Sequence, residues 1–321
     1  MKHLLHLFTL LCLLLMANSC AANGTDEPAY EPQKTDIKTD TLSILAIGNS
    51  FTYDALSYLP YLFQKIKPTT HFTLGILYYP GGTLDTQYDH LGNNRHYTSY
   101  HRWTSDVGTW QKMTDSQAHH VLHEQDWSII TLQQGSVDSN EYANYTRHID
   151  FIMGLLHEHC PGSRLAWMVT PAYADGYLGL TNGLLKLNGQ PASYTSDQMF
   201  EAIAACARQL TTDYHFDLVL PCGTAVQNAR HTLLGQYGVS GSLTYDGLHQ
   251  QEGIGCFVEA CAAFLAITRL QWQDATLTIQ DSWNIPYPHG KVTGMGVTNQ
   301  MIAWACAQQA QEHPFQVTPI P

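Results

Sequence analysis

Three polar side chains, one early in the chain and two late, are of the types that nucleophilic hydrolysis requires. Ser50 follows the apolar run 44–47 and completes a Gly-Asn-Ser turn. Asp246 and His249 stand close together in the stretch Thr-Tyr-Asp-Gly-Leu-His. At this spacing in a loop, the carboxylate can orient the imidazole, which then accepts the serine proton. The sequence predicts Ser50 as nucleophile, His249 as general base and Asp246 as the residue that orients the base.

The elements around Ser50 must hold it at the edge of a sheet. A short apolar run that ends in a turn and is followed by a helical pattern indicates a buried strand just before the serine. A side chain at the carboxyl end of a parallel strand faces the crevice where open α/β sheets bind ligands. Because a Gly-Asn-Ser triplet is also typical of an ordinary turn, the prediction depends equally on Asp246 and His249.

Helices and short apolar strands alternate along the rest of the chain. This alternation predicts a three-layer α/β/α sandwich with a parallel sheet covered on both faces. Further strands are expected at 72–78, 128–132, 165–169 and 216–220, and helices at 50–66, 142–159, 253–270 and 298–311. One more helix is expected to begin at a capping box formed by Thr195 and Gln198.

The composition suits one globular domain over residues 42–321. The 321 residues are 44% hydrophobic and carry a formal net charge of −12, which offers no electrostatic footprint for a nucleic acid. The cysteines beyond residue 20 are scattered in apolar patterns, without the close spacing of a disulfide framework. We expect buried free thiols, with one or two unassigned disulfides as the alternative, among Cys160, Cys206, Cys222, Cys256, Cys261 and Cys306.

Residues 1–20 have the proportions of a secretory signal peptide. Lys2 precedes the apolar run 4–16, which is too short to span a bilayer. The small residues before Cys20 resemble a bacterial lipobox, in which case Cys20 becomes the lipidated first residue; a plain signal peptide is the alternative. Residues 21–41 are polar and contain proline, as in a flexible tether. The expected location is the bacterial cell envelope, at the outer membrane, through a lipid anchor.

Four motifs resemble the SGNH, or GDSL-like, hydrolase superfamily, over roughly residues 42–312. They are Gly48-Asn49-Ser50-Phe51, Pro80-Gly81-Gly82-Thr83-Leu84, the stretch from Trp127 to Ser136, and Asp246-Gly247-Leu248-His249. Their combination resembles a bacterial branch labelled as a domain of unknown function. The resemblance implies a flavodoxin-like sheet and acyl transfer to serine without a metal or cofactor. Ordinary α/β-hydrolases instead have Gly-x-Ser-x-Gly and separate loops for the acid and the histidine.

The resemblance also implies donors for an oxyanion hole. Gly82 lies in a two-glycine turn, where a backbone N–H can approach a ligand closely, although a plain turn is the alternative. Where the superfamily has an asparagine after the third strand, this chain has Gln133 and Gln134. A glutamine carboxamide is the same donor on a longer arm. The expected donors are the N–H groups of Ser50 and Gly82 and the side chain of Gln133, with Gln134 as the fallback.

The long connection 85–126 is rich in aromatic residues and histidines. Aromatic rings beside polar groups suit a rim that contacts a sugar, here formed by Tyr88, Trp103 and Trp110, but they suit a small aromatic core equally well. The expected function is a serine esterase that removes acetyl or another small acyl group from a carbohydrate.

Two other functions stay open in the sequence. One is a glycan-binding lipoprotein on an SGNH scaffold that has lost its activity, because fold does not imply function. The other is a metal site at His119 and His123, which share a face of a predicted helix but lack a third ligand at a motif distance.

Overall fold

The computed structural model describes residues 40–270 and 293–320. The chain divides into two units, Met1–Glu31 and Pro32–Pro321, of which the first lies wholly outside the described residues. The predicted signal peptide, Cys20 and nearly all of the predicted tether therefore lie outside them too. Among the helices of the described residues, none combines the length and the hydropathy that a membrane crossing requires.

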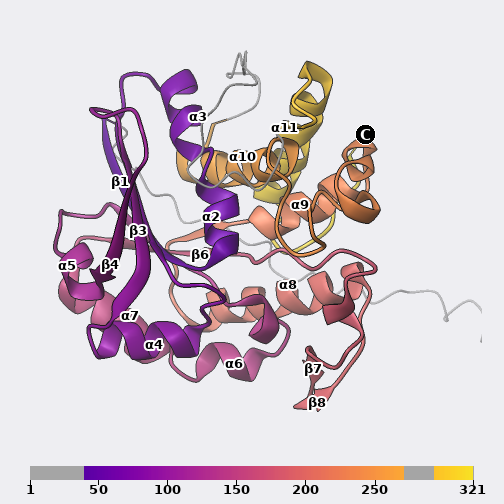
Figure 1. Ribbon diagram of the computed structural model, residues 1–321, viewed down its shortest axis with the longest axis horizontal. Helices are drawn as coiled ribbons and strands as arrows, with labels where there is room; N and C mark the ends of the chain where they lie inside the picture. The colour runs from indigo at the N-terminus through magenta and orange to yellow at the C-terminus, as the bar shows by residue number, and fades with distance from the viewer. Residues whose placement is uncertain (1–39, 271–292, 321) are drawn as a thin grey trace, which may run out of the picture. The chain divides into compact units, whose positions relative to one another are not determined.

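A sheet of seven strands forms the middle layer of the second unit, in the order β4-β3-β2-β1-β5-β6-β9 (Figure 1). Five of the strands are parallel and, counted by themselves, follow the flavodoxin-like order 2-1-3-4-5. They are β1 (Thr41–Gly48), β2 (His71–Tyr78), β5 (Ile129–Leu132), β6 (Arg164–Met168) and β9 (Leu218–Leu220). The predicted α/β fold is confirmed, and the order of the strands reverses between β1 and β5.

Two antiparallel strands extend the sheet beyond β2, where a parallel sheet alone was predicted. The stretch 85–126 is not an irregular connection, because it contains α4 (Leu84–Gly92), β3 (His96–Thr104), β4 (Gln111–Gln117) and α5 (Ala118–Leu122). The sequence did not reveal β4 because it is an almost wholly exposed edge strand of mainly polar residues, which gives no apolar alternation.

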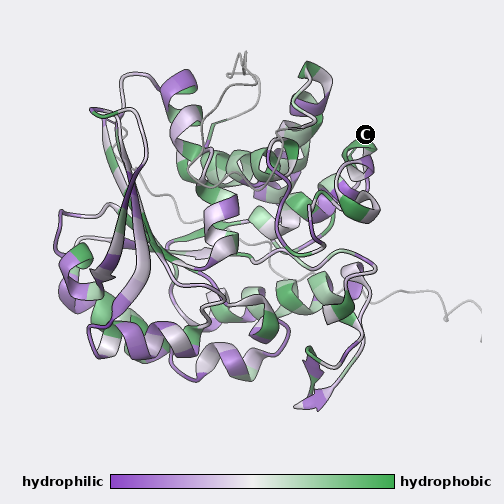
Figure 2. Cartoon of the chain, in the orientation of Figure 1, coloured by the Kyte–Doolittle hydropathy of each residue, from purple (hydrophilic) through white to green (hydrophobic). Residues whose placement is uncertain are grey.

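Helices cover both faces of the sheet, which confirms the three predicted layers (Figure 1). One face carries α2 (Ser50–Leu56), α3 (Leu59–Ile66), α9 (Cys222–Arg230), α10 (Ile254–Thr268) and α11 (Val297–Glu312). The other carries α4, α5, α6 (Tyr142–Thr146), α7 (Ile149–His159) and α8 (Ser196–Asp213). Figure 2 shows α10 as hydrophobic along most of its length, and every residue from 254 to 267 is buried. This helix is the apolar centre of its layer.

Several helix boundaries differ from the predicted ones. The helix predicted over 50–66 is two helices, because Pro60 lies in the first turn of α3 and cannot donate to a preceding turn. The one predicted over 142–159 is also two, α6 and α7. The capping box of Thr195 and Gln198 is confirmed at the start of α8. Short elements complete the connections: β7 (Lys186–Leu187), β8 (Gln190–Pro191), η1 (Ser136–Asp138), η2 (Leu178–Leu180), η3 (Leu233–Gln236) and η4 (Val239–Gly241).

The six cysteines of the described residues are free and buried, as predicted. Burial raises the pKa of Cys206 to about 12, and it raises the pKa of Cys222 and Cys261 well above the usual range. These thiols are therefore protonated packing groups rather than nucleophiles.

Candidate active site

Ser50, His249 and Asp246 form a continuous hydrogen-bonded relay. The Ser50 Oγ lies 2.8 Å from His249 Nε2, and His249 Nδ1 lies 2.8 Å from an Asp246 carboxylate oxygen. The sheet explains how residues so far apart in sequence meet. β1 ends at Gly48, so Ser50 begins α2 at the carboxyl edge of the sheet, beside the point where the strand order reverses.

The carboxylate of Asp246 is held by more than the imidazole. Its second oxygen accepts the backbone N–H groups of Leu248 at 2.8 Å and of His249 at 2.7 Å. Partial burial opposes the ionisation of Asp246, but the hydrogen bonds from the His249 ring and from these two N–H groups outweigh it and lower the pKa of the carboxyl. Asp246 is therefore an anion at neutral pH, as a group that orients an imidazole must be.

Two aromatic rings fix the plane of the imidazole. Tyr245 stacks on His249 with ring centroids 5.7 Å apart and an angle of 15° between the planes. Phe51, the residue after the serine, contacts the same imidazole with centroids 5.9 Å apart. Burial, with the neighbouring carboxylates Asp246 and Asp54, raises the pKa of Tyr245 to about 12, so its hydroxyl stays protonated 3.3 Å from His249 Nδ1.

Asn49 joins the ends of three strands around the serine, a role that the sequence did not reveal. Its Nδ2 donates to the carbonyl of Gly82 at 2.9 Å. Its Oδ1 accepts the N–H of Phe51 at 2.9 Å and the side-chain Nε2 of Gln133. Asn49 is 2% exposed and caps α2, so it holds the serine turn to both neighbouring strand ends.

The two glutamines predicted as oxyanion donors have different hydrogen-bond partners. Gln133 lies beside the serine turn, 2% exposed, with one amide N–H directed to Asn49. Gln134, the fallback, is bonded elsewhere: its oxygen accepts the N–H groups of Leu84 and Gly135, and its nitrogen donates to the carbonyl of Asn144. Its carboxamide is thus used in tying loops together.

Gly82 is present at the expected edge but its N–H is not free. It donates to the carbonyl of Tyr79 at 3.1 Å, which closes a turn. The carbonyl of Gly82 accepts a hydrogen bond from the Asn49 side chain. The N–H of Gly82 can bind an oxyanion only if the turn opens and its bond to Tyr79 breaks. The Ser50 N–H lies in the first turn of α2, where helical N–H groups have no partner within the helix.

The predicted aromatic rim is not one surface. Trp103 is 0% exposed and packs against Phe72 in the core, so its predicted contact with a ligand is wrong. Tyr88 is exposed but stacks on His148, with ring centroids 4.0 Å apart. Trp110 is half-buried and contacts Tyr53 of the serine helix at 6.4 Å between centroids. An aromatic residue in an alternating strand packs inward or outward according to its register, which composition does not give.

Two tyrosines, Tyr177 and Tyr245, lie against the Asp246–His249 loop in addition to Phe51. Tyr245 is 36% exposed and stacks on the imidazole. Tyr177 is half-buried and contacts Gly247, where an added Cβ would come within 2.9 Å of its ring. Both tyrosines lie outside the aromatic-rich stretch 85–126, where the sequence predicts the rim.

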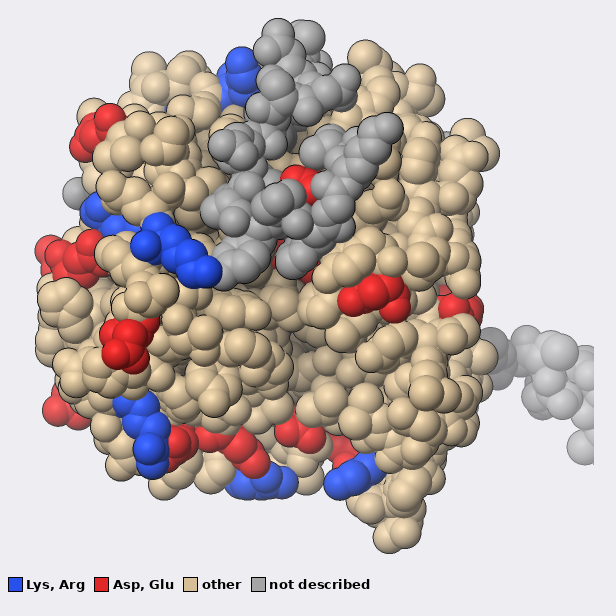
Figure 3. All heavy atoms as spheres, viewed as in Figure 1, with Lys and Arg blue, Asp and Glu red and all other residues tan. Residues whose placement is uncertain are grey.

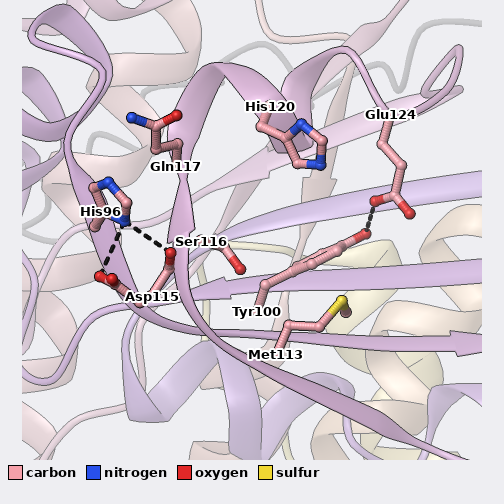
Figure 4. Close-up of a pocket in the computed structure, with 8 residues that line it drawn as sticks. All are labelled: His96, Tyr100, Met113, Asp115, Ser116, Gln117, His120 and Glu124. Atoms are coloured by element: carbon pink, nitrogen blue, oxygen red, sulfur yellow. Dashed lines mark hydrogen bonds and ion pairs between the residues drawn. The ribbon is translucent and has the colours of Figure 1, made fainter.

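A pocket of about 360 Å³ lies within that region, over the antiparallel edge of the sheet (Figure 4). Figure 4 shows the lining side chains, which come from β3, β4, α5 and the turn after α5, with the Tyr100 hydroxyl bonded to Glu124 and His96 bonded to Asp115. Its lining mixes carboxylates, imidazoles, a carboxamide and a thioether: His96, Tyr100, Met113, Asp115, Ser116, Gln117, His120 and Glu124.

The histidines considered as metal ligands gather at the surface with a third that their spacing did not suggest. His159 Nδ1 lies 2.8 Å from His123 Nε2, and the rings of His119 and His159 are 4.3 Å apart between centroids. His119 Nε2 is bonded to the carbonyl of Leu91. In residues 40–270 and 293–320, no group of three or more His, Cys, Asp or Glu side chains is arranged to hold a metal ion.

The structure is an α/β fold in which a mostly parallel sheet lies between helices, with Ser50, His249 and Asp246 joined at the carboxyl edge of the sheet. The family described as Domain of unknown function (DUF4886) matches residues 43–280. The chain belongs to the DUF4886 family.

One solved structure agrees with this fold, and two others are more distantly similar. A DUF4886 family protein from Bacteroides uniformis is 23% identical with a TM-score of 0.73, covering 88% of this chain and 98% of that one. A candidate SGNH hydrolase from Slackia heliotrinireducens is 17% identical with a TM-score of 0.46, covering 71% and 99%. A candidate GDSL-like lipase from Parabacteroides merdae is 11% identical with a TM-score of 0.48, covering 74% and 99%. No curated protein is significantly similar to the chain.

Proposed function

We propose that the protein is a serine esterase that removes acetyl or another small acyl group from a carbohydrate. The observation that carries the proposal is the relay itself, in which the Ser50 hydroxyl, the His249 imidazole and the Asp246 carboxylate are joined by bonds of 2.8 Å. Each atom of the relay has the partner that activation of a serine hydroxyl requires.

The mechanism follows from these contacts. His249 Nε2 accepts the proton of Ser50 as Oγ attacks the acyl carbonyl carbon, and Asp246 stabilises the imidazolium that forms. Nε2 then gives this proton to the departing sugar oxygen, which leaves an acyl-serine. Water, deprotonated by the same nitrogen, releases the acid and restores Ser50. In this proposal the N–H of Ser50 stabilises the oxyanion, together with the second amide N–H of Gln133, because its first N–H donates to Asn49.

Two features support a carbohydrate as the group that carries the ester. Tyr177 and Tyr245 offer ring surface beside the relay, and one face of a pyranose is apolar. On the face drawn in Figure 3, acidic and basic side chains are interspersed mainly along the margins, and most of the surface between them is uncharged. A neutral, hydroxyl-rich ligand suits such a surface better than a polyanion.

The test compares the wild type with Ser50→Ala on p-nitrophenyl acetate, p-nitrophenyl octanoate and an O-acetylated oligosaccharide. We expect kcat/KM to be highest on the acetylated oligosaccharide and to vanish in the variant. Hydrolysis that survives in Ser50→Ala would remove the serine mechanism. A clear preference for octanoate would replace the carbohydrate ester by a lipid-like one.

A glycan-binding protein without turnover is the second candidate, and one observation favours it. The Gly82 N–H is engaged with Tyr79, and one Gln133 amide N–H with Asn49, so fewer free donors face an oxyanion than the serine mechanism uses. Binding of the intact acetylated oligosaccharide, measured by calorimetry with no product formed over hours, is the result that selects this function.

We also propose a lipid anchor at Cys20, which the lipobox-like sequence supports. Metabolic labelling of the full chain with an alkyne fatty acid tests it. Label and membrane association are expected in the wild type and not in Cys20→Ala, and a soluble, unlabelled wild type would exclude the anchor.

A further inference from the structure

The loop that carries His249 is attached to the helix that carries Ser50 by a buried carboxylate. Asp54 lies one turn after Ser50 in α2 and is 1% exposed. Its Oδ2 accepts the backbone N–H of Gln250 at 2.9 Å. Gln250 directly follows His249 and is itself fully buried. The bond therefore links the backbone next to the base with the helix of the nucleophile.

A second bond repeats the attachment further along both segments. The Tyr58 hydroxyl accepts the N–H of Gly253 at 3.0 Å, and Tyr58 is 1% exposed. Gly253 has φ of +95°, and an added Cβ would lie 2.2 Å from the carbonyl of Thr293. Only glycine fits there, so the turn into α10 presents its N–H to the tyrosine in one conformation. Figure 1 shows α2 beside α10, and the two helices pack against each other.

The other backbone hydrogen bonds of the loop run within it or to segments other than α2, such as the bond from the Ala174 N–H to the carbonyl of Gly247 at 2.9 Å. The Tyr245 N–H donates to the carbonyl of His249, and the Gln251 N–H donates to the carbonyl of Leu243. These bonds shape the loop but do not set its distance from α2. The bonds from Asp54 and Tyr58 join the loop to the segment that bears Ser50, so they set the separation of Oγ and Nε2.

We propose that Asp54 is a positioning residue for the Ser50–His249 pair, with Tyr58 as its supporting contact. The inference rests on the proposed function, because it concerns the geometry of the same reaction. The two bonds hold Nε2 at 2.8 Å from Oγ before substrate binds. Since a misplacement of about 1 Å can cost about 10²-fold in rate, loss of the Asp54 bond lowers kcat and the rate of serine labelling, while KM changes little.

The test measures kcat, KM and the rate of fluorophosphonate labelling in Asp54→Ala, Asp54→Asn and Tyr58→Phe. We expect a fall of about 10²-fold in kcat for Asp54→Ala. Asp54→Asn keeps an oxygen that accepts the Gln250 N–H and is expected to recover most of the rate. Tyr58→Phe removes one hydroxyl and is expected to lower kcat several-fold. The matched control is Tyr142→Phe, which loses a single hydroxyl bond to Asp213 on the other helical layer and is expected to act as wild type.

Hydrogen exchange supplies a readout that needs no turnover. Faster exchange in peptides spanning 244–253, with the rest of the protein unchanged, is expected in Asp54→Ala and in Tyr58→Phe. The positioning role is overturned if Asp54→Ala and Tyr58→Phe both keep the wild-type kcat and labelling rate. It is also overturned if kcat falls as far in Asp54→Asn as in Asp54→Ala. If Asp54→Ala does not fold, Tyr58→Phe decides alone. If the folded wild type does not react with the fluorophosphonate, the proposed function is overturned instead. Hydrogen exchange in the variants then still shows whether the bonds to Asp54 and Tyr58 hold the loop.

Discussion

Replacing Asp246 by asparagine is expected to invert the hydrogen bonding of the relay while leaving its shape intact. One carboxylate oxygen accepts two backbone N–H groups, from Leu248 and His249, at 2.8 and 2.7 Å. Only an oxygen can stay there, because an NH₂ group would oppose both donors and lose two bonds of about 1 kcal/mol each. The asparagine NH₂ must therefore face His249 Nδ1, where the structure has the second carboxylate oxygen at 2.8 Å.

The consequence is the wrong tautomer of the base. A donor opposite Nδ1 makes that nitrogen the acceptor and leaves the proton on Nε2, which then donates to Ser50 and cannot accept its proton. Loss of the correct tautomer in a Ser-His-Asp triad costs on the order of 10⁴-fold in kcat. Stopped-flow or steady-state hydrolysis of p-nitrophenyl acetate by Asp246→Asn measures the loss. Asp106→Asn, at a side chain 86% exposed, is the control. Activity within tenfold of wild type in Asp246→Asn would refute this reasoning.

Three further changes test the site and its support. Asn49→Asp sets a carboxylate oxygen against the carbonyl of Gly82, so urea titration is expected to show a loss of about 1–3 kcal/mol; an unchanged midpoint would contradict the role of Asn49. Burial, with Lys112 nearby, lowers the pKa of His101 from 6.5 to about 4. Between pH 6.5 and about 4 the unfolded chain binds a proton at His101 but the folded protein does not, so the protein loses up to about 3 kcal/mol of stability as the pH falls through this range. In His101→Phe, we expect the free energy of unfolding to depend less on pH over the same range. Burial and the nearby Asp54 raise the pKa of Glu259 well above its usual range, against the opposing effect of Arg230. The unfolded chain therefore loses this proton at a lower pH than the folded protein, and stability falls as the pH rises above the ordinary range of glutamate. Glu259→Gln is therefore expected to raise the melting temperature near pH 8 and to leave it unchanged near pH 4, and equal melting temperatures at both would contradict the assignment.

The sequence was sufficient for the parts of this site that depend on local pattern. An apolar run before Ser50 marks β1, and a short spacing places Asp246 against His249 in one loop. Both features follow from the chain within a few residues, so no tertiary contact is needed to infer them. The alternation of strands and helices likewise indicates the parallel core and its two covering layers.

The features that were missed depend on contacts between distant segments. Asn49 holds Gly82 across 33 residues, and Asp54 holds Gln250 across 196. Nothing in the sequence near Asp54 distinguishes it from a surface residue of an amphipathic helix. Trp103 failed as a rim residue because its side chain points into the core from β3, a strand whose register the sequence does not fix. Long-range register and burial, rather than residue type, decide these roles.

The central claim is that the relay activates Ser50. The most direct measurement is intact-mass and peptide analysis of the purified protein after reaction with a fluorophosphonate. We predict one adduct, on Ser50, that is absent in Ser50→Ala and forms at least a hundredfold more slowly in His249→Ala, since a positioned base contributes about 10²–10⁴-fold. A folded wild type that stays unmodified, or an adduct that forms as fast without His249, would contradict the claim.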